Sequence, residues 1–418
     1  MDKAEDSAEI IVIGAGIIGI TTAIELQSMG AKVTVLDREG VAAGASRGNA
    51  GAFAFSDAAP VASPGIMKKA PKWLLDPLGP LSIPLPYALK ITPWMFRFWR
   101  ASRPEQVRAG IAALVALMTV SRERLVPFME QTGTHNMLRQ HGNLQLYESR
   151  KAFEESLPSW RERASRGINF TALTSPEEIM EHQSGLDRRF VGAIYTNDWY
   201  GISDPKDYTN RLGEYFQSRG GTIRIAEAVA VETTSGDVFV MLSDGTRLSV
   251  GHVVIAAGAW SHLLARTLGD HIPLETERGY NTTLPVGAFD LKRQLSFEEH
   301  GFVVSPLSSG IRVGGAVELG GLKLPPNYRR ADALLKKAKA FLPGLKTEGG
   351  TQWMGFRPSL PDSIPVIGPA TCSDRVTYAF GHGHLGLTQS AGTARIVANL
   401  VMGRENAVDL APYSPQRF

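Results

Sequence analysis

The sequence predicts an α/β protein, in which a parallel sheet assembled from three separated stretches of chain carries an inserted α+β domain built on an antiparallel sheet. Three observations predict it. Residues 10–13 (IIVI) form a β-branched run that leads directly into glycines, residues 252–257 (HVVIAA) form a second such run, and residues 377–380 precede a glycine-rich loop and a long helical pattern. Continuous apolar runs of this kind are typical of strands buried on both faces of a parallel sheet.

Length and composition describe an ordinary globular chain. Its 418 residues favour two or three domains, at about 150 residues per domain. Lys plus Arg number 44 and Asp plus Glu 41, a net charge of only +3, which is weaker than a nucleic-acid-binding protein usually shows. The single cysteine, Cys372, excludes an intrachain disulfide and a cysteine-based metal cluster, and it fits a reducing compartment. We therefore expect no nucleic-acid partner and no metal site.

We expect no targeting or membrane-spanning segment. The N-terminus (MDKAEDSAE) is acidic where a secretory signal is basic. The most apolar helical stretch, residues 111–120, has about half the roughly 20 residues that a transmembrane helix needs. A cytoplasmic location is expected, and contact with the inner face of the cytoplasmic membrane is left open.

The first element is a complete β-α-β unit. Strand 10–13 leads into Gly14-x-Gly16-x-x-Gly19, a helical pattern ends at Gly30, and a second strand, 32–36, ends at Asp37. Gly14 permits the tight turn, Gly16 lets backbone amides approach a pyrophosphate, and Gly19 lets helix and strand pack closely. The helix N-terminus offers free N–H groups to phosphates, and Asp37 can accept hydrogen bonds from a ribose diol. The motif predicts dinucleotide binding without distinguishing FAD from NAD.

The loop after the second strand, residues 44–51 (GASRGNAG), is rich in small residues. Small side chains and the Ser46 hydroxyl suit close passage of a diphosphate chain and the edge of a flavin ring. A plain surface loop is the alternative.

The middle of the chain alternates helices and strands. Asp204 is expected to cap a helix that has Pro205 in its first turn. The residues 235–236 and 244–245 are expected to turn short strands back on themselves. Further helices are expected at 105–135, 152–166, 176–182, 205–217, 330–341 and 390–402, and further strands at 142–147, 191–196, 222–225, 228–232, 301–305 and 311–317.

These motifs together resemble the flavoprotein family of D-amino acid oxidase and dehydrogenase. The residues 10–26 with Asp37-Arg38, the GASRGNAG loop and VVIAAGAW (253–260) match that family in order. The segments GFRPSLPDSIPVIG (355–368) and GHGHLGLT (381–388) are similar to its two closing motifs. Residues 63–83 are similar to the bacterial D-amino acid dehydrogenase small-subunit type, whereas residues 105–200 carry little resemblance.

The resemblance implies a Rossmann-like FAD-binding domain and a substrate-binding domain. The FAD-binding domain would comprise residues 1–58, 200–265 and 350–418, and the substrate-binding domain residues 59–199 and 266–349. FAD would be bound non-covalently, because Cys372 lies beyond Gly368 rather than beside Arg357. The implied cofactor-binding residues are Gly14, Gly16, Ile17, Ile18, Gly19, Asp37, Arg38, Ala45, Ser46, Asn49, Ala50, Gly51, Val229, Ala257, Gly258, Trp260, Gly381, Gly383, Leu385, Gly386, Leu387 and Thr388.

The implied reaction is oxidative deamination of a D-amino acid. Hydride would pass from the α-carbon to flavin N5, and the imino acid would hydrolyse to a 2-oxo acid; FAD performs the redox step and the protein binds and orients. Arg357 matches the family's carboxylate-binding arginine, a role that suits a planar guanidinium. Arg312 is either a second carboxylate contact or a sheet-edge charge, and Tyr280 either a hydroxyl donor to the carboxylate or a core tyrosine.

The roles of the histidines follow less directly from the resemblance than that of Arg357. His382 and His384 lie in a loop that covers the flavin in relatives, where backbone N–H groups are the safer functional groups. The small-subunit type usually has a hydroxyl residue at the position of His384, which weakens the transfer of its substrate preference. A lone histidine at position 300 is expected to be structural.

The insert between residues 64 and 104 combines aromatic and basic side chains. Such a mixture could lie on a membrane surface, where a dehydrogenase could pass electrons to a quinone. A lid or substrate-domain surface with buried aromatic residues is the alternative. The side chains concerned are Trp73, Trp94, Phe96, Phe98, Trp99, Lys68, Lys69, Lys72, Lys90, Arg97, Arg100 and Arg103.

The sequence leaves three alternatives to oxidation of a D-amino acid. A cyclic or N-substituted amino acid (hydroxyproline, sarcosine, glycine or an opine) is the second candidate substrate. A pyridine-nucleotide reductase would need a second glycine fingerprint, and none occurs around residues 150–260. A catalytically inactive nucleotide-binding subunit would be favoured by loss of Arg357 or of the glycine-rich loop near residue 383, and both are present.

Overall fold

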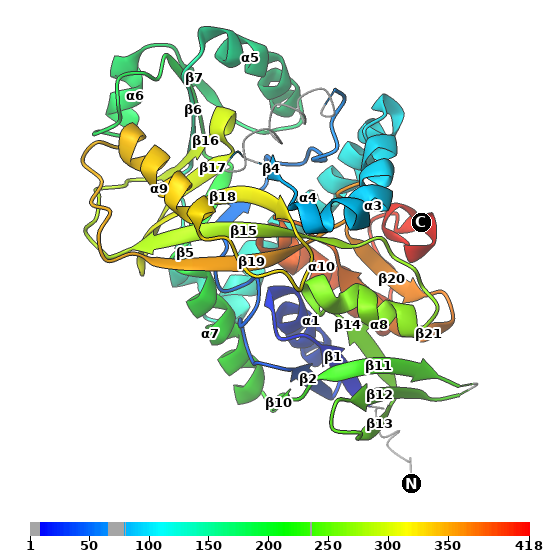
Figure 1. The fold of residues 1–418 in the computed structure, drawn as a ribbon. Coiled ribbons are helices and arrows are strands. Elements are labelled where there is room, and N and C mark those ends of the chain that lie inside the picture. The colour runs from blue at the N-terminus through cyan, green and yellow to red at the C-terminus, as the bar shows by residue number, and fades with distance from the viewer. Residues whose placement is uncertain (1–8, 66–78, 80, 235) are drawn as a thin grey trace.

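The computed structural model describes residues 9–65, 79, 81–234 and 236–418, which fold around two large sheets (Figure 1). The first sheet has six strands in the order β10-β2-β1-β14-β21-β20. All neighbours are parallel except the β20–β21 pair. Its strands are β1 (Ile10–Ile13), β2 (Val33–Asp37), β10 (Thr222–Ile225), β14 (His252–Ile255), β20 (Val366–Ala370) and β21 (Ser373–Phe380). Three distant stretches of sequence thus meet in one sheet, as expected.

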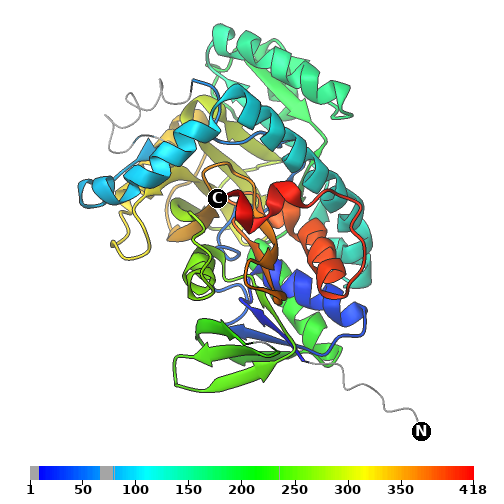
Figure 2. The same ribbon diagram turned by 90° about the vertical axis from the view of Figure 1, so that its right-hand side faces the viewer.

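Different layers cover the two faces of this sheet. One face packs against helices α1 (Ile17–Ser28), α4 (Pro104–Gln131), α7 (Pro205–Ser218) and α10 (Gly386–Val401). The other packs against α8 (Ser261–Thr267) and a small antiparallel sheet of β11 (Ala228–Thr233), β12 (Val238–Leu242) and β13 (Arg247–Val250). Figure 2 shows α1 and α10 side by side in the lower half of the molecule. The strands of the sheet are therefore buried on both sides, which explains their continuous apolar sequence.

The second sheet is mainly antiparallel and runs in the order β19-β15-β18-β17-β16-β6-β8-β7, with β4 beside β18. Its long strands are β15 (Glu275–Leu284), β18 (Gly310–Leu319) and β19 (Thr351–Ser359), which cross the middle of the molecule in Figure 1. The shorter strands are β4 (Leu81–Ser82), β6 (Asn143–Tyr147), β7 (Thr171–Leu173), β8 (Gly192–Thr196), β16 (Gln294–Phe297) and β17 (Phe302–Leu307). Helices α6 (Pro176–His182) and α9 (Arg329–Phe341) share one core with it, and α5 (Arg150–Ser165) packs on its other face.

A third, small sheet and one amphipathic helix complete the fold. The small sheet pairs β9 (Trp199–Ile202) with β3 (Ala52–Ala54) and β5 (Leu138–Arg139). Helix α3 (Ala88–Ala101) follows the undescribed residues 66–78 and 80. No helix in the described part of the chain is both long enough and apolar enough to cross a bilayer.

The structure confirms most of the expected elements and differs from the expectations in two. Asp204 caps α7, because its carboxylate accepts hydrogen bonds from the amides of Lys206 and Asp207. Helix α3 was not predicted. Strand β19 pairs with β15 in the second sheet, although its residues were assigned to the FAD-binding domain. Ser235, expected in a turn, lies outside the described residues.

Candidate active site

A cavity of about 640 Å³ lies at the carboxyl ends of the parallel strands and extends to the second sheet. Its walls include residues that directly follow β1, β2, β14 and β21, together with residues of β15, β18 and β19. Ligands of doubly wound sheets bind outside the carboxyl ends of the strands. All four predicted substrate-site residues line the same cavity, namely Tyr280, Arg312, Arg357 and His384.

The glycine fingerprint has the geometry that its sequence predicts. A Cβ on Gly19 would lie 1.8 Å from the carbonyl oxygen of Gly14, so α1 can approach β1 only with glycine there. Gly19 itself lies behind the cavity wall, consistent with a packing role. The N-cap residue Gly16 supplies no side chain, which leaves the start of α1 open toward the cavity. The first-turn N–H groups have no acceptor within the helix, so this end of the cavity fits a pyrophosphate.

Two polar side chains brace this end. The Asp37 carboxylate accepts hydrogen bonds from the amides of Ala15 (2.8 Å), Glu39 (2.8 Å) and Gly40 (2.9 Å). The Ser46 hydroxyl accepts from the amide of Ile17 at 2.8 Å. Both predicted residues line the cavity, and both also hold the backbone that would surround the dinucleotide.

The outer wall of this end is formed by Arg38 and Trp260. The Arg38 guanidinium lies 3.8 Å from the centre of the Trp260 ring. The predicted Val229, Ala257 and Gly258 line the cavity beside them. Glu227, which the sequence did not indicate, lies in the same wall. An aromatic and apolar slot of this kind fits a planar base such as adenine.

The loop at residues 48–50 is anchored on three strands of the second sheet. The carbonyl oxygen of Gly48 accepts from Asn281 Nδ2 (2.8 Å), that of Asn49 from Arg312 Nη1 (2.7 Å), and that of Ala50 from Gln294 Nε2 (3.4 Å). These side chains come from β15, β18 and β16. The loop that faces the middle of the cavity is therefore positioned by the neighbouring domain.

Two predicted cofactor residues, Gly51 and Gly381, lie behind the cavity wall. Gly51 is not part of the cavity wall, because it packs against Ile202 and Leu307. Gly381 is likewise behind the wall and packs against Leu360. The other predicted members of these two loops do line the cavity, namely Ala45, Ser46, Asn49, Ala50, Gly383, Leu385, Gly386, Leu387 and Thr388.

Arg357 carries the most informative charge of the cavity. Its guanidinium lies across Gly279, where a Cβ would be 2.5 Å from Nη2, and Nη1 donates to the carbonyl oxygen of Ala316 at 3.3 Å. Burial lowers the pKa of Arg357, and the charge of Glu277 on the facing strand opposes this shift. Arg357 forms no ion pair with a carboxylate of the described residues. An enclosed cation without a counter-ion is suited to binding an anion.

Arg312 and Tyr280 are already engaged by the protein. Arg312 donates through Nε to Thr283 (3.0 Å) and through Nη1 to Asn49, and β18 lies inside the sheet rather than at its edge. The sheet-edge interpretation of Arg312 is therefore wrong, and a contact with substrate stays a prediction. The buried Tyr280 hydroxyl donates to Glu318 (2.9 Å) and accepts from the amide of Asn327 (3.0 Å). These contacts favour the core-tyrosine interpretation.

The two histidines of the closing loop differ. His382 is buried, its Nε2 lies 3.0 Å from the Thr393 hydroxyl, and burial lowers its pKa to about 3, so its ring is neutral. His384 faces the cavity, with Nε2 3.3 Å from the Asp57 carboxylate. Burial alone would lower the pKa of His384, but the hydrogen bond and charge of Asp57 raise it above its ordinary value. Asp57 was not identified from the sequence, although it directly follows the apolar run after the GASRGNAG loop.

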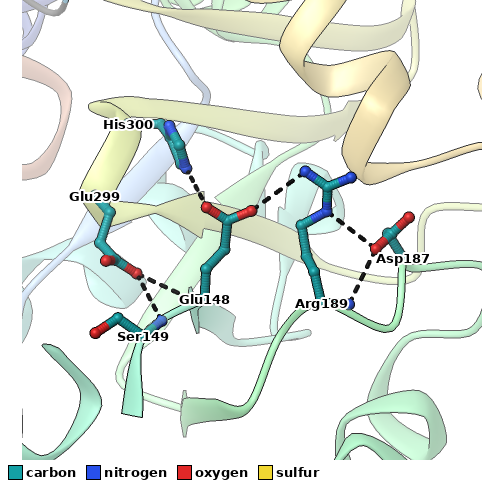
Figure 3. Close-up of polar contacts among 6 residues, drawn as sticks. All are labelled: Glu148, Ser149, Asp187, Arg189, Glu299 and His300. Atoms are coloured by element: carbon teal, nitrogen blue, oxygen red, sulfur yellow. Dashed lines mark hydrogen bonds and ion pairs between the residues drawn. The ribbon is translucent and has the colours of Figure 1, made fainter. Parts of the chain in front are cut away.

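Two other residues lie away from the cavity. His300 contacts Glu148 at 2.9 Å, and Glu148 also contacts Arg189 at 3.4 Å (Figure 3). Neither His300 nor Glu148 lines the cavity, in agreement with a structural role. Cys372 is exposed and also outside the cavity wall. The chain's one thiol therefore cannot link to a flavin held there.

Fold and cavity together define a dinucleotide-dependent enzyme with an anion-binding pocket beside its cofactor site. Residues 9–400 match the family model of the FAD dependent oxidoreductases. The chain belongs to this family, and FAD is its cofactor.

Known proteins are similar over nearly the whole chain. A D-amino-acid oxidase of Bradyrhizobium diazoefficiens is 32% identical, with 99% of each chain covered. A D-amino acid dehydrogenase of Dechloromonas aromatica is 32% identical over 94% of this chain and 97% of its own. Among solved structures, glycine oxidase from Geobacillus kaustophilus superposes with a TM-score of 0.75 at 22% identity, covering 98% of this chain and 99% of its own.

Proposed function

We propose that the protein oxidises a D-amino acid to an imino acid, which water then converts to a 2-oxo acid. The observation that carries this proposal is the guanidinium of Arg357, which lines the cavity from the second sheet and forms no ion pair among the described residues. A substrate carboxylate is the anion that it would hold. The names of the two relatives with 32% identity support the same substrate class.

The protein's part in this reaction is binding and orientation. FAD, when bound, supplies the hydride acceptor. Arg357 would fix the substrate carboxylate with charge-assisted hydrogen bonds, which places the α-carbon on the cavity side of β19. The loop at residues 48–50, held by Asn281, Arg312 and Gln294, would fix the opposite wall. Amine deprotonation needs no dedicated base if the neutral amine is the form that reacts.

A substrate panel tests the proposal. Under anaerobic conditions, D-amino acids should bleach the flavin absorbance of the purified protein, and their L-enantiomers should not. Preferential bleaching by hydroxyproline, sarcosine, glycine or an opine would instead favour the second candidate, a cyclic or N-substituted amino acid. If none of these compounds bleached a flavin-loaded preparation, the proposal would be refuted.

We propose a dehydrogenase that passes its electrons to a quinone-like acceptor at an anionic membrane surface. Helix α3 supports this, because its solvent-facing side exposes Phe96 and Trp99, with Leu89 89% exposed two turns before Phe96. Lys90, Arg97 and Arg100 flank these side chains, and residues 81–104 contain no acidic side chain. Apolar anchors framed by basic residues suit the headgroup region of anionic lipids. Trp73, Lys68, Lys69 and Lys72 of the predicted patch lie outside the described residues.

Vesicle binding tests the surface. The protein should sediment with phosphatidylglycerol vesicles and much less with phosphatidylcholine vesicles, and a quinone analogue should reoxidise the reduced flavin faster than oxygen does. Leu89→Glu should abolish sedimentation, whereas Val286→Glu, at a 75% exposed position on a loop after β15, should not. Equal sedimentation of both variants would exclude α3 as the contact.

A further inference from the structure

The side chains of three consecutive residues that follow β16 lie in different environments. The short helix η4 (Glu298–His300) places Glu299 and His300 against the β6 end: Glu299 accepts from the amides of Glu148 (2.9 Å) and Ser149 (3.4 Å), and His300 contacts the Glu148 carboxylate (Figure 3). Glu298 instead lines the cavity that holds Arg357 and His384. Two of the three side chains therefore secure the local fold, and the third faces the site.

Glu298 has no protein partner of the kind that its neighbours have. Among the described residues, the Glu298 carboxylate forms no ion pair and no hydrogen bond. Two other acidic groups near the cavity are engaged: Asp57 contacts His384, and Glu318 pairs with Arg278 at 2.7 Å. Glu298 is an exposed residue, and it lines the open cavity.

The charges around Glu298 define its setting. Burial and the negative charge of Asp57 raise the pKa of Glu298, and the positive charges of Arg163 and His384 oppose the rise, so that the pKa lies at about 6. The Arg163 guanidinium lies 4.5 Å from the centre of the Trp160 ring. A carboxylate of raised pKa gains when a cation enters.

Glu298, His384 and Arg357 line the same cavity. His384 responds to the charges of Asp57, Glu277 and Arg357, and Glu298 responds to His384 and Asp57. All of these except Glu277 line the one cavity. A molecule held by its carboxylate at Arg357 and long enough to reach Glu298 would meet a second, negatively charged group of the same cavity. The cavity offers a cation at one end of such a molecule and an anion farther along it.

We propose that Glu298 recognises a positive charge on the substrate side chain, so that the enzyme prefers amino acids with an amine or guanidine at the end of the side chain. The proposal rests on the proposed function, because it presumes a substrate carboxylate at Arg357. It adds a specificity residue that takes no part in the redox chemistry.

Binding of compounds that cannot be oxidised tests this directly. 6-Aminohexanoate and heptanoate differ only in the replacement of an ammonium by a methyl group, and neither has an α-amine. Calorimetry of the flavin-loaded protein should show 6-aminohexanoate binding about 10- to 100-fold more tightly, the range of a charge-assisted hydrogen bond. Glu298→Gln should remove this difference while leaving heptanoate affinity and flavin content unchanged. Glu299→Gln, the matched control on the same turn, should keep it.

Turnover separates the two proposals. D-Lysine should exceed D-2-aminoheptanoate in kcat/KM for the parent protein, and Glu298→Gln should equalise the two by lowering only the D-lysine value. If Glu298→Gln lowered both values equally, Glu298 would serve the α-amine and this inference would be overturned. If both substrates reacted equally well in the parent protein, the inference would fail while the proposed function stood. If neither reacted, the proposed function would fail.

Discussion

The two ends of the cavity satisfy their polar groups in opposite ways. At the fingerprint end, the polar side chains bind the protein's own backbone: Asp37 accepts hydrogen bonds from three backbone amides, and Ser46 accepts one from a fourth. The groups that remain for the ligand at this end are backbone N–H groups. At the other end, Arg357 and Glu298 face the cavity without an opposite charge at contact distance among the described residues. The first end is rigid before its ligand arrives, whereas the second leaves charges for the ligand to neutralise.

This difference indicates which end of the cavity tolerates amino-acid substitutions and which end does not. A backbone cradle tolerates few substitutions, because its shape depends on close approach between main chains. A pocket of unpaired charges can change its preference by one side chain without disturbing the fold. The predictions below test each half of this contrast, beginning with the largest expected effect.

Gly19→Ala should eliminate flavin binding. The added methyl would lie 1.8 Å from the Gly14 carbonyl oxygen, so α1 would be forced away from β1 and the cradle would open. The ratio of 450 nm to 280 nm absorbance should fall to that of a flavin-free protein. Gly236→Ala, where nothing lies within 4 Å of the added methyl, is the control and should retain flavin. A yellow Gly19→Ala protein would contradict the rigid-cradle description.

Arg357→Ala should lower kcat/KM by about 10²- to 10³-fold, the effect of removing one partner of an enclosed charge pair. Flavin content should be unchanged, because Arg357 belongs to the other end of the cavity. Arg357→Lys should recover part of the loss, since a lysine keeps the charge but not the planar fork. Steady-state kinetics with one D-amino acid measures both variants. An unchanged KM in Arg357→Ala would remove this residue from the site.

Lowering the pH should erase the preference for cationic side chains. Burial and the charge of Asp57 hold the pKa of Glu298 at about 6, so its carboxylate is charged above that pH and becomes neutral as the pH falls through it. Lysine side chains stay protonated throughout, so the ratio of kcat/KM for D-lysine to that for D-2-aminoheptanoate should fall up to about tenfold from pH 7.5 to 5. Titration of His384 or of the α-amine affects both substrates and largely cancels in the ratio. A flat ratio would contradict the assignment.

Tyr280→Phe should have the smallest effect on activity. Its hydroxyl is occupied by Glu318 and Asn327, so its loss should lower the free energy of unfolding by about 1 to 2 kcal/mol. KM should change less than twofold. Urea denaturation measures the free energy of unfolding, and steady-state kinetics measures KM. A tenfold rise in KM with normal stability would instead place the hydroxyl on the substrate.

The fingerprint end could be predicted from sequence because its determinants are local. The strand, the spaced glycines and Asp37 lie within 28 consecutive residues, 10–37, and backbone physics assigns each a role. The periodic helices α4, α5, α7 and α9 were found for the same reason. Arg357 was found only through family resemblance, since nothing in its own neighbourhood indicates an unpaired charge.

The acidic part of the site was missed because it exists only in three dimensions. Asp57 follows β3, Glu298 follows β16 and His384 precedes α10, so their meeting depends on how the two sheets pack. Glu298 and Glu299 are adjacent and identical in the sequence, and only the course of the chain separates their roles. Helix α3 was missed because Pro93 and its many aromatic residues obscure the helical period.

The central position of β14 has a consequence for biosynthesis. This strand joins β1 to β21, which is synthesised much later than β1, and α10 then packs against α1. At about 5 to 20 residues per second, the early β-α-β unit must wait some 20 to 80 seconds for its remaining neighbours. Capture of the vitamin-derived coenzyme is therefore an event that follows the synthesis of β21, and chains shortened before residue 373 should be colourless and vulnerable to proteases.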